Sequence, residues 1–300
     1  MNAADFLQEA PGRLITARTG YLAFVPNALP PPLPPSWELS SASSEAERSL
    51  AALDRVLAAL PSPDLLVAPF VRREAVLSSR IEGTRASLGE LLEFEAAGAA
   101  EKGSDVREVE NYVAALNYGV ERLGSLPLSL RFIRELHATL MADGPAHLTP
   151  GQFRRTQNWI GRPGSTLATA TFVPPPPEEM QAALADLERY LHERSELPPL
   201  IRIGLVHYQF EAIHPFLDGN GRIGRLLVSL LLYTEGLVQA PAPYLSAFID
   251  RYRNDYYRLL LDVSRRGAWS EWLEFFLRAV ASEASDGARR GEALLAVRAR

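Results

Sequence analysis

Apolar residues recur every three to four positions along most of the chain, with polar residues between them, and this spacing is typical of amphipathic helices. Helices are predicted for residues 44–60, 70–82, 87–96, 105–122, 127–141, 178–191, 226–234, 250–264 and 270–284. Aromatic residues on and beside the last helix follow helical spacing, at Trp269, Trp272, Phe275 and Phe276, and indicate a core-facing stripe. The pattern therefore predicts an all-α helical bundle.

Two segments break this pattern. Residues 1–35 contain a cluster of prolines, and proline removes a backbone donor, so we expect an extended arm without regular structure there. Residues 159–161 and 169–173 flank a turn that contains Gly, Pro and Ser, which predicts a β-hairpin. An ordinary surface hairpin explains this second segment as well as a functional one does.

Composition narrows the classes of protein. With 300 residues and 47% hydrophobic content, the chain can bury one large core, or one core with a smaller appended layer. The net charge of −5 gives no support for a nucleic-acid-binding face. The chain has no cysteine, which excludes thiolate metal sites, and a zinc site is not expected from the spacing of its histidines. We expect a cytoplasmic protein without a membrane span, because a signal peptide and a long apolar run are absent.

Residues 214–225 read His-Pro-Phe-Leu-Asp-Gly-Asn-Gly-Arg-Ile-Gly-Arg and carry the most informative chemistry in the chain. Helical apolar spacing on both sides predicts a loop between two helices, the second of which begins near Gly221. The start of a helix offers unpaired N–H groups and the positive end of the helix dipole. Gly219 and Gly221 let the backbone approach an anion closely, so the loop is predicted to bind phosphates.

The side chains of this loop suit separate tasks. His214 titrates near neutrality and suits a general base, whereas Asp218 is a hard oxygen ligand suited to Mg²⁺. Asn220 can donate to phosphate oxygens. Arg222 and Arg225, about one helical turn apart, can hold the distal phosphates of a nucleotide.

The segment matches the His-Pro-Phe-x-Asp-Gly-Asn-Gly-Arg-x-x-Arg signature of Fic-domain proteins at every fixed position, and the resemblance covers roughly residues 40–280. It implies transfer of AMP from ATP to a Tyr, Thr or Ser hydroxyl of a target protein. By resemblance, His214 takes the proton of that hydroxyl and Asp218 holds Mg²⁺. Asn220 and the glycine amides form an anion hole, while Arg222 and Arg225 hold the pyrophosphate that leaves.

A second motif, Ser-x-x-x-Glu-Gly, lies on a predicted helix that restarts after Pro69 and stops at Gly83. Such a short pattern recurs by accident on helix surfaces, but it also marks Fic proteins that carry an inhibitory helix in their own N-terminal part. By resemblance, Glu82 pairs with Arg225 and blocks the place of the γ-phosphate, and Ser78 belongs to the same motif.

Two further groups of residues are assigned by resemblance alone. The predicted hairpin corresponds to the family's flap, which holds the target by main-chain pairing, so Thr171, Phe172 and Val173 are expected to dock the target. Asn254 and Tyr257 could border the adenine pocket, although packing in the core explains these residues equally well.

The resemblance implies a Fic-fold bundle with a β-hairpin flap and an N-terminal helical layer. We expect a proline-rich arm at residues 1–40, an inhibitory region at 41–100, the Fic core at 101–280 and a helical tail at 281–300. Many relatives continue into a winged-helix domain, whereas this sequence stops at Arg300. Expected partners are ATP, a target protein, the chain itself as a modified substrate, and a second copy in a homodimer.

Three alternatives to AMP transfer stay open. The same base and metal can remove AMP from a modified target, with Glu82 positioning water. Another nucleotide can replace ATP, although relatives that act as kinases carry Lys at the position of Gly221. The fold can also bind nucleotide as a signal, so that the protein regulates or docks without needing turnover.

Overall fold

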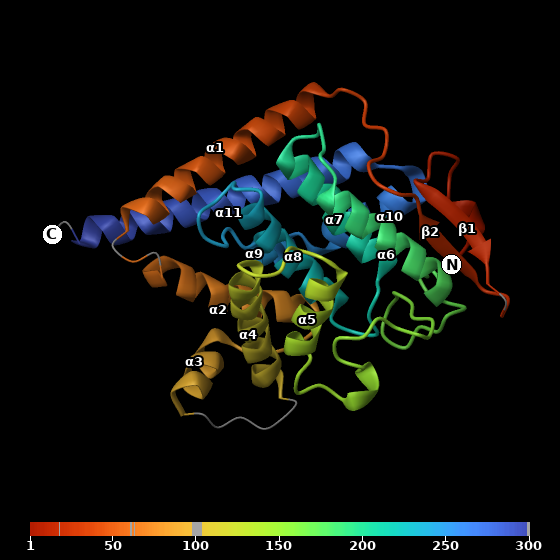
Figure 1. Ribbon diagram of the computed structural model, residues 1–300, viewed down its shortest axis with the longest axis horizontal. Coiled ribbons are helices and arrows are strands. Elements are labelled where there is room, and N and C mark those ends of the chain that lie inside the picture. The colour runs from red at the N-terminus through yellow and green to blue at the C-terminus, as the bar shows by residue number, and fades with distance from the viewer. Residues whose placement is uncertain (18, 61, 63, 98–103, 299–300) are drawn as a thin grey trace.

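The computed structural model describes residues 1–300 except 18, 61, 63, 98–103 and 299–300 (Figure 1). The α-helices of the described part are α1 (Trp37–Ala59), α2 (Asp64–Ile81), α3 (Leu88–Ala97), α4 (Asp105–Leu123), α5 (Leu130–Leu140), α6 (Pro177–His192), α7 (Pro199–Ile213), α8 (Asn220–Thr234), α9 (Ser246–Arg251), α10 (Arg253–Arg266) and α11 (Trp269–Arg298). Two strands, β1 (Gly12–Thr16) and β2 (Leu22–Pro26), form the sheet. The predicted all-α class is confirmed.

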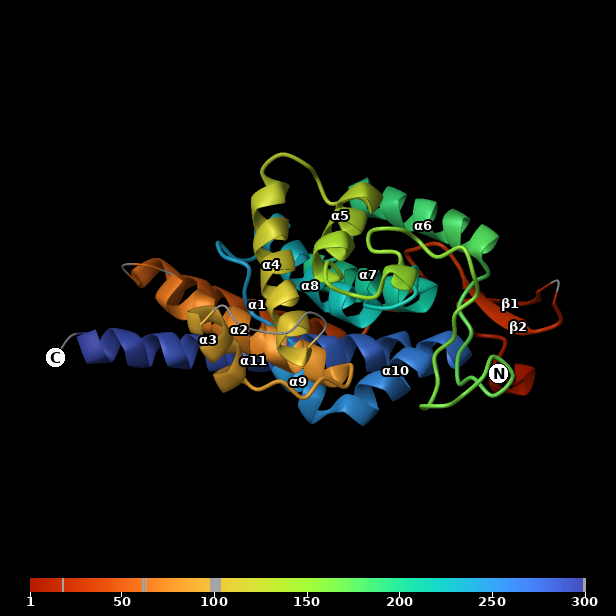
Figure 2. The ribbon, with the colours of Figure 1, turned by 90° about the horizontal axis from the view of Figure 1, so that it is seen from below.

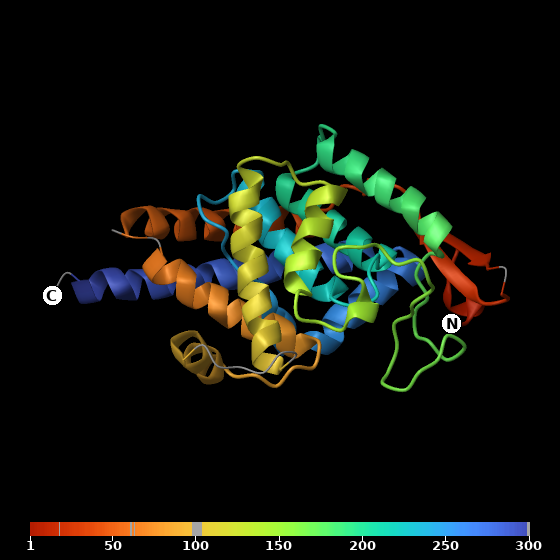
Figure 3. The same ribbon diagram turned by 60° about the horizontal axis from the view of Figure 1, so that its bottom comes forward.

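Helices α7 and α8 form the centre of the bundle. Nearly all of their residues are buried, so neither helix has the polar face of a surface helix. Helices α2, α4 and α5 pack against α8, while α6, α10 and α11 pack against α7. Figure 3 shows α4 and α5, in yellow and yellow-green, crossing in front of this central pair. A loop between α7 and α8 is therefore held at both ends by the core.

The long helices α1 and α11 run side by side along the molecule (Figure 1). Gly287 of α11 lies against Leu53 of α1, where an added Cβ would come within 3.0 Å of a leucine methyl group. Because α11 is continuous from Trp269 to Arg298, the expected boundary between core and tail at residue 280 falls inside one helix. The expected boundary at residue 100 lies outside the described residues.

Several predicted helix ends differ from the structure. Helix α1 begins at Trp37, seven residues before the predicted start, because Ser36 caps it by accepting the Leu39 N–H. Helix α2 begins at Asp64 and contains Pro69, so the helix predicted to start at residue 70 is part of a longer one. The predicted helix at 250–264 is divided into α9 and α10 at Tyr252.

The expectation that residues 1–35 lack regular structure is wrong for residues 12–26. Strands β1 and β2 pair antiparallel, with Leu14 opposite Phe24, because the prolines cluster only from Pro26 onward. The hairpin lies at the opposite end of the molecule from the C-terminus (Figure 2). Phe24 is fully buried and its N–H donates to the carbonyl of Val173, so β2 braces the segment predicted as a flap.

The segment predicted as the flap hairpin forms less β-structure than expected. Ile160 and Phe172 make a single antiparallel bridge, and the residues around it are bends and turns. The Trp159 indole donates to the Ser165 carbonyl and helps to close the tip. No helix in the described part of the chain is long and apolar enough to cross a membrane.

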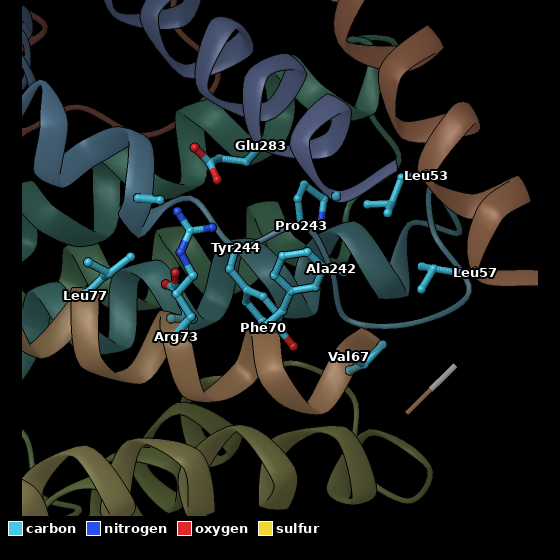
Figure 4. A pocket seen from close by; sticks show the side chains of 13 residues that line it. Leu53, Leu57, Val67, Phe70, Arg73, Leu77, Ala242, Pro243, Tyr244 and Glu283 are labelled. Atoms are coloured by element: carbon cyan, nitrogen blue, oxygen red, sulfur yellow. The ribbon is translucent and has the colours of Figure 1, made fainter. Parts of the chain in front are cut away.

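A small hollow lies between α1, α2, α11 and the segment that leads into α9 (Figure 4). Arg73 of α2 extends toward Glu283 of α11 there. Glu74 also lines the hollow and is buried. Glu74 accepts hydrogen bonds from the Ser246 hydroxyl and N–H and from the Tyr112 hydroxyl, so it fastens α2 to its neighbours. Burial raises the pKa of Glu283 to about 7, although Arg73 partly offsets this effect.

Glu283→Gln is expected to change the pH dependence of stability between about pH 4.5 and pH 7. The folded protein holds the Glu283 proton in this range and the unfolded chain releases it, so this carboxyl lowers the free energy of unfolding as the pH rises. Urea unfolding at pH 5 and pH 7.5 should show that wild type loses stability relative to the Gln variant at the higher pH. The exposed Glu292 of the same helix is the control, and Glu292→Gln should leave the slope unchanged. Equal slopes for wild type and Glu283→Gln would contradict this assignment.

Candidate active site at the loop between α7 and α8

His214 ends α7 in a left-handed conformation, with φ 49° and ψ 61°. A residue other than glycine rarely adopts this backbone, and such positions concentrate at functional sites. The N–H of His214 donates to the Phe210 carbonyl, and its Nδ1 lies 3.3 Å from the Glu211 carbonyl. A carbonyl can only accept, so this contact favours a proton on Nδ1 and leaves the Nε2 lone pair available.

The imidazole of His214 is neutral at physiological pH. Burial lowers its pKa to about 4, with the positive charge of Arg154 as the next cause. The negative charges of Glu82 and Asp218 act in the opposite direction. A neutral imidazole with a free Nε2 can accept a proton, which is the requirement for a general base.

The start of α8 is built for an anion. Gly219 adopts φ 78°, and no side chain caps the helix there. A Cβ on Gly221 would lie 2.2 Å from the Glu82 Oε1 and 3.0 Å from the Arg225 Nη1, so a larger residue at this position would have to displace the Glu82 carboxylate. The first amides of the helix lie beside the Arg225 guanidinium, and both kinds of group can bind phosphate oxygens.

Asn220 supports the loop with its side chain. Its Oδ1 accepts the Phe216 N–H at 2.8 Å, and its Nδ2 donates to the Phe216 carbonyl at 2.9 Å. The side chain expected to donate to phosphate is thus occupied by the loop itself, which leaves the backbone N–H of Asn220 for an anion.

The two arginines of the motif are almost completely buried. Arg225 donates its Nε to the Ser78 hydroxyl at 2.8 Å, and its Nη2 to the Ser78 carbonyl and to Oε1 of Glu82 at 2.9 and 2.8 Å. Arg222 donates to Glu108 at 3.0 Å. The structure thus brings Ser78 and Glu82 from the end of α2 onto the guanidinium of α8, as expected by resemblance, and Gly83 follows with φ 110°.

The Asp218 side chain is 52% exposed at the mouth of the site. Its Oδ1 accepts the Gly219 N–H, and its Oδ2 lies 3.7 Å from the Arg222 Nη2. In the described part of the chain, no group of three or more His, Cys, Asp or Glu side chains could hold a metal. One accessible carboxylate fits Mg²⁺ that takes its other ligands from phosphates and water.

Comparisons with known families agree with this geometry. Residues 40–121 match the Fic/DOC family N-terminal region and residues 127–232 match the Fic/DOC family, which together cover more than half of the chain. The chain belongs to the Fic/DOC family.

Named relatives and solved structures are similar to this Fic protein. It is 31% identical over 165 residues to "Protein adenylyltransferase fic-1" of Caenorhabditis elegans, which covers 52% of this chain and 30% of the relative. It is 30% identical over 230 residues to "Protein adenylyltransferase Fic" of Drosophila willistoni, with 71% and 42% covered. The chain thus spans less than half the length of these curated relatives.

Among solved structures, a Fic family protein from Desulfovibrio desulfuricans G20 has a TM-score of 0.67 at 25% identity, with 86% of this chain and 76% of that chain covered. A Fic domain containing signaling protein from Bacteroides thetaiotaomicron VPI-5482 has a TM-score of 0.63 at 23% identity, with 85% and 97% covered. The second likeness supports the fold alone.

The residues of this Fic protein that were expected to dock the target or to border the adenine pocket differ in how far they are exposed. Phe172 and Val173 are 5% and 1% exposed and face the interior, whereas Thr171 is exposed. Asn254 is exposed, and Tyr257 is 41% exposed with the Arg253 guanidinium 5.9 Å from its ring centroid. The accessible part of the flap is therefore its backbone and tip.

Three residues important for the Fic loop were not found from the sequence, namely His137, Arg154 and Asn158. His137 accepts the Gly151 N–H at Nδ1, so its Nε2 carries the proton and donates to the Asp218 carbonyl at 3.0 Å. Its ring stacks on Phe216 with centroids 3.7 Å apart. These contacts join segments about 80 residues apart, so no local spacing could have indicated them.

Glu82→Gln is expected to lower the free energy of unfolding by about 2 kcal/mol, because the buried Arg225 loses a charged hydrogen-bond partner. Urea unfolding of the two proteins at pH 7 measures this difference. Asp255→Asn is the control, since Asp255 pairs with Arg258 and both side chains are more than half exposed, so it should cost less than about 1 kcal/mol. Equal losses in the two variants would show that the burial of Arg225 does not strengthen its pair with Glu82.

Proposed function

We propose that this protein is an auto-inhibited protein adenylyltransferase, which transfers AMP from ATP to a Tyr, Thr or Ser hydroxyl of a target protein. The observation that carries the proposal is the neutral His214 imidazole, with Nε2 free, next to the uncapped start of α8 and its buried arginines. Relatives named protein adenylyltransferases support the choice of reaction.

Each group has a step in this reaction. Nε2 of His214 takes the proton of the attacking hydroxyl, whose oxygen forms a bond to the α-phosphorus of ATP. The bond from the α-phosphorus to the bridging oxygen breaks, and pyrophosphate leaves with both electrons. The α8 amides and the guanidiniums of Arg222 and Arg225 stabilise the negative charge as it moves. Asp218 would hold Mg²⁺ bound with ATP, and this ion would supply further charge neutralisation.

Glu82 restrains the reaction in the resting protein. Its carboxylate occupies the Arg225 Nη2 at 2.8 Å, which is the donor that a γ-phosphate would need. A second anion cannot bind there without displacing the first or being repelled by it. ATP is therefore held out of its productive position until the end of α2 moves or Glu82 is replaced.

The proposal also includes a cytoplasmic location, a homodimer in solution and self-modification when no target is present. The basis is the lack of a long apolar run for the location and the family resemblance for the other two. Light scattering after gel filtration measures the oligomeric state. These features do not enter the reaction steps above.

Glu82→Gly is expected to raise AMP transfer at least about tenfold over wild type, because ATP gains the Arg225 donor. Wild type, Glu82→Gly and Glu82→Gly/His214→Ala are incubated with Mg²⁺ and α-labelled ATP, with and without a cell lysate. Label is followed on gels and the adduct by intact mass. The double variant should lose roughly 10²-fold or more of the released activity, because it lacks the base. If Glu82→Gly binds ATP but labels nothing, AMP removal, another nucleotide or nucleotide-dependent docking takes the place of transfer.

Asp218→Asn, introduced into Glu82→Gly, is expected to raise the Mg²⁺ concentration for half-maximal labelling at least about tenfold, because the site loses its accessible carboxylate. A Mg²⁺ titration at saturating ATP measures this. Asp255→Asn, an exposed carboxylate on α10 that pairs with Arg258, is the control and should leave the titration unchanged. An unchanged titration for the Asp218 variant would remove Asp218 from the metal site.

A further inference from the structure

Arg154 is the most completely buried arginine of the described chain, with 1% of its surface exposed, yet it makes no ion pair there. It lies in the segment between α5 and α6. Its guanidinium instead donates only to backbone carbonyls, which are those of His214 at 2.9 Å, Thr156 at 3.2 Å, Pro175 at 2.5 Å and Ile213 at 3.4 Å. Its own N–H donates to the Pro215 carbonyl at 2.9 Å.

These contacts fix the backbone at the end of α7. The carbonyls of Ile213 and His214 belong to the last turn of a helix, which lacks intrahelical donors, and a cation there also interacts favourably with the helix dipole. The side-chain amide of Asn158 also donates hydrogen bonds to the His214 carbonyl at 3.2 Å and to the Phe216 carbonyl at 2.8 Å. The unusual left-handed conformation of His214 is thus held from several directions.

The same guanidinium joins the flap to the catalytic loop. Thr156 precedes the flap and Pro175 follows it, and both give their carbonyls to Arg154. Gln157 reinforces the closure by donating to the Pro174 carbonyl. A shift of the flap base would therefore move the group that holds His214 in place.

The charge of Arg154 acts on the imidazole as well. The ionisable groups that face His214 are Glu82 from the end of α2, Asp218 from the loop and Arg154 from the flap side. The two carboxylates favour a protonated imidazole, whereas the guanidinium opposes it. Burial lowers the pKa of Arg154 to about 10, so the guanidinium stays charged at neutral pH.

We propose that Arg154 is the positioning residue of this site, which holds His214 in its reactive orientation and, through its charge, opposes the nearby carboxylates that favour protonation of the imidazole. The proposal rests on the role of His214 as base given above. It separates two contributions of one side chain, since the forked geometry orients the loop and the positive charge adds to the effect of burial in disfavouring protonation of His214.

Two replacements distinguish these contributions. Arg154→Lys keeps the charge but loses the fork, so labelling by the Glu82→Gly protein should fall about tenfold or more at every pH with an unchanged pH profile. Arg154→Gln loses the charge, so the pKa of His214 should rise by about one pH unit, and the rate at pH 5 should fall further than the rate at pH 8.

The pKa of His214 is read from the ring C–H signals of the nucleotide-free protein between about pH 2.5 and pH 8, with His214→Ala to assign them. This readout needs no transfer activity, so it stays informative if the proposed reaction is wrong. Arg202 of α7 provides the matched control, because it caps the carbonyls of Tyr190 and Leu191 at the C-terminal end of α6. Arg202→Gln should lower stability without moving the His214 titration.

The outcomes are decisive in either direction. Unchanged His214 titration in a folded Arg154→Gln protein would overturn the electrostatic part, and full activity of Arg154→Lys would overturn the positioning part. If the Gln variant does not fold, the Lys variant decides alone, since the proposal requires it to combine a wild-type His214 titration with a reduced rate. A change of the same size after Arg202→Gln would mean that any loss of a helix-end cap explains the result.

Discussion

The positive charge of Arg225, buried in the middle of the bundle, is the constraint on which the arrangement of the site depends. A guanidinium that is 2% exposed must find acceptors inside the protein, because burying an unpaired charge is very costly. Ser78 and Glu82 provide these acceptors from the end of α2, which packs against α8. Glu74, one turn before Ser78, fastens the same helix through Ser246. In addition to its apolar packing in the core, the N-terminal layer is therefore held by polar contacts that end at the candidate site, and a change that loosens these contacts also changes the site.

The central pair α7 and α8 explains why so short a loop can carry the chemistry. Both helices are buried on nearly all sides, so the positions of Ile213 and Asn220, where the loop leaves and re-enters the core, have little freedom. Six residues lie between these two positions and form the loop. The loop is stabilised by hydrogen bonding between the Asn220 side-chain amide and the Phe216 backbone, and by the ring of His137, which stacks on Phe216. Preorganisation of this kind is what a reaction controlled by positioning and charge requires.

The sequence alone predicts those parts of the site that are marked by a local pattern of residues. It does not predict the contacts between segments that are far apart along the chain. The loop with His214 and Asp218 was predicted correctly as a link between two helices, because helical spacing flanks it on both sides. The contact of Glu82 with Arg225 spans 143 positions and could be expected only through the family resemblance. Arg154 was missed because its partners are backbone carbonyls, which every residue possesses. The burial of Phe172 and Val173 was missed because Phe24 of an unforeseen hairpin covers that segment.

Glu211 shows how closely the charges of the site are balanced. It lies three residues before His214, its Oε1 is buried without a hydrogen-bond partner in the described structure, and a Cβ on Gly224 would lie 2.2 Å from that oxygen. Burial raises its pKa to about 8, while Arg225 lowers it and Glu82 raises it. At neutral pH the cluster therefore holds one cation against one ionised carboxylate, Glu82, with Glu211 mostly protonated beside them. Glu82 occupies the Arg225 Nη2 in this structure. In the proposed function, the γ-phosphate of ATP would compete with Glu82 for that donor, so inhibition and productive nucleotide binding would be alternative states of one guanidinium.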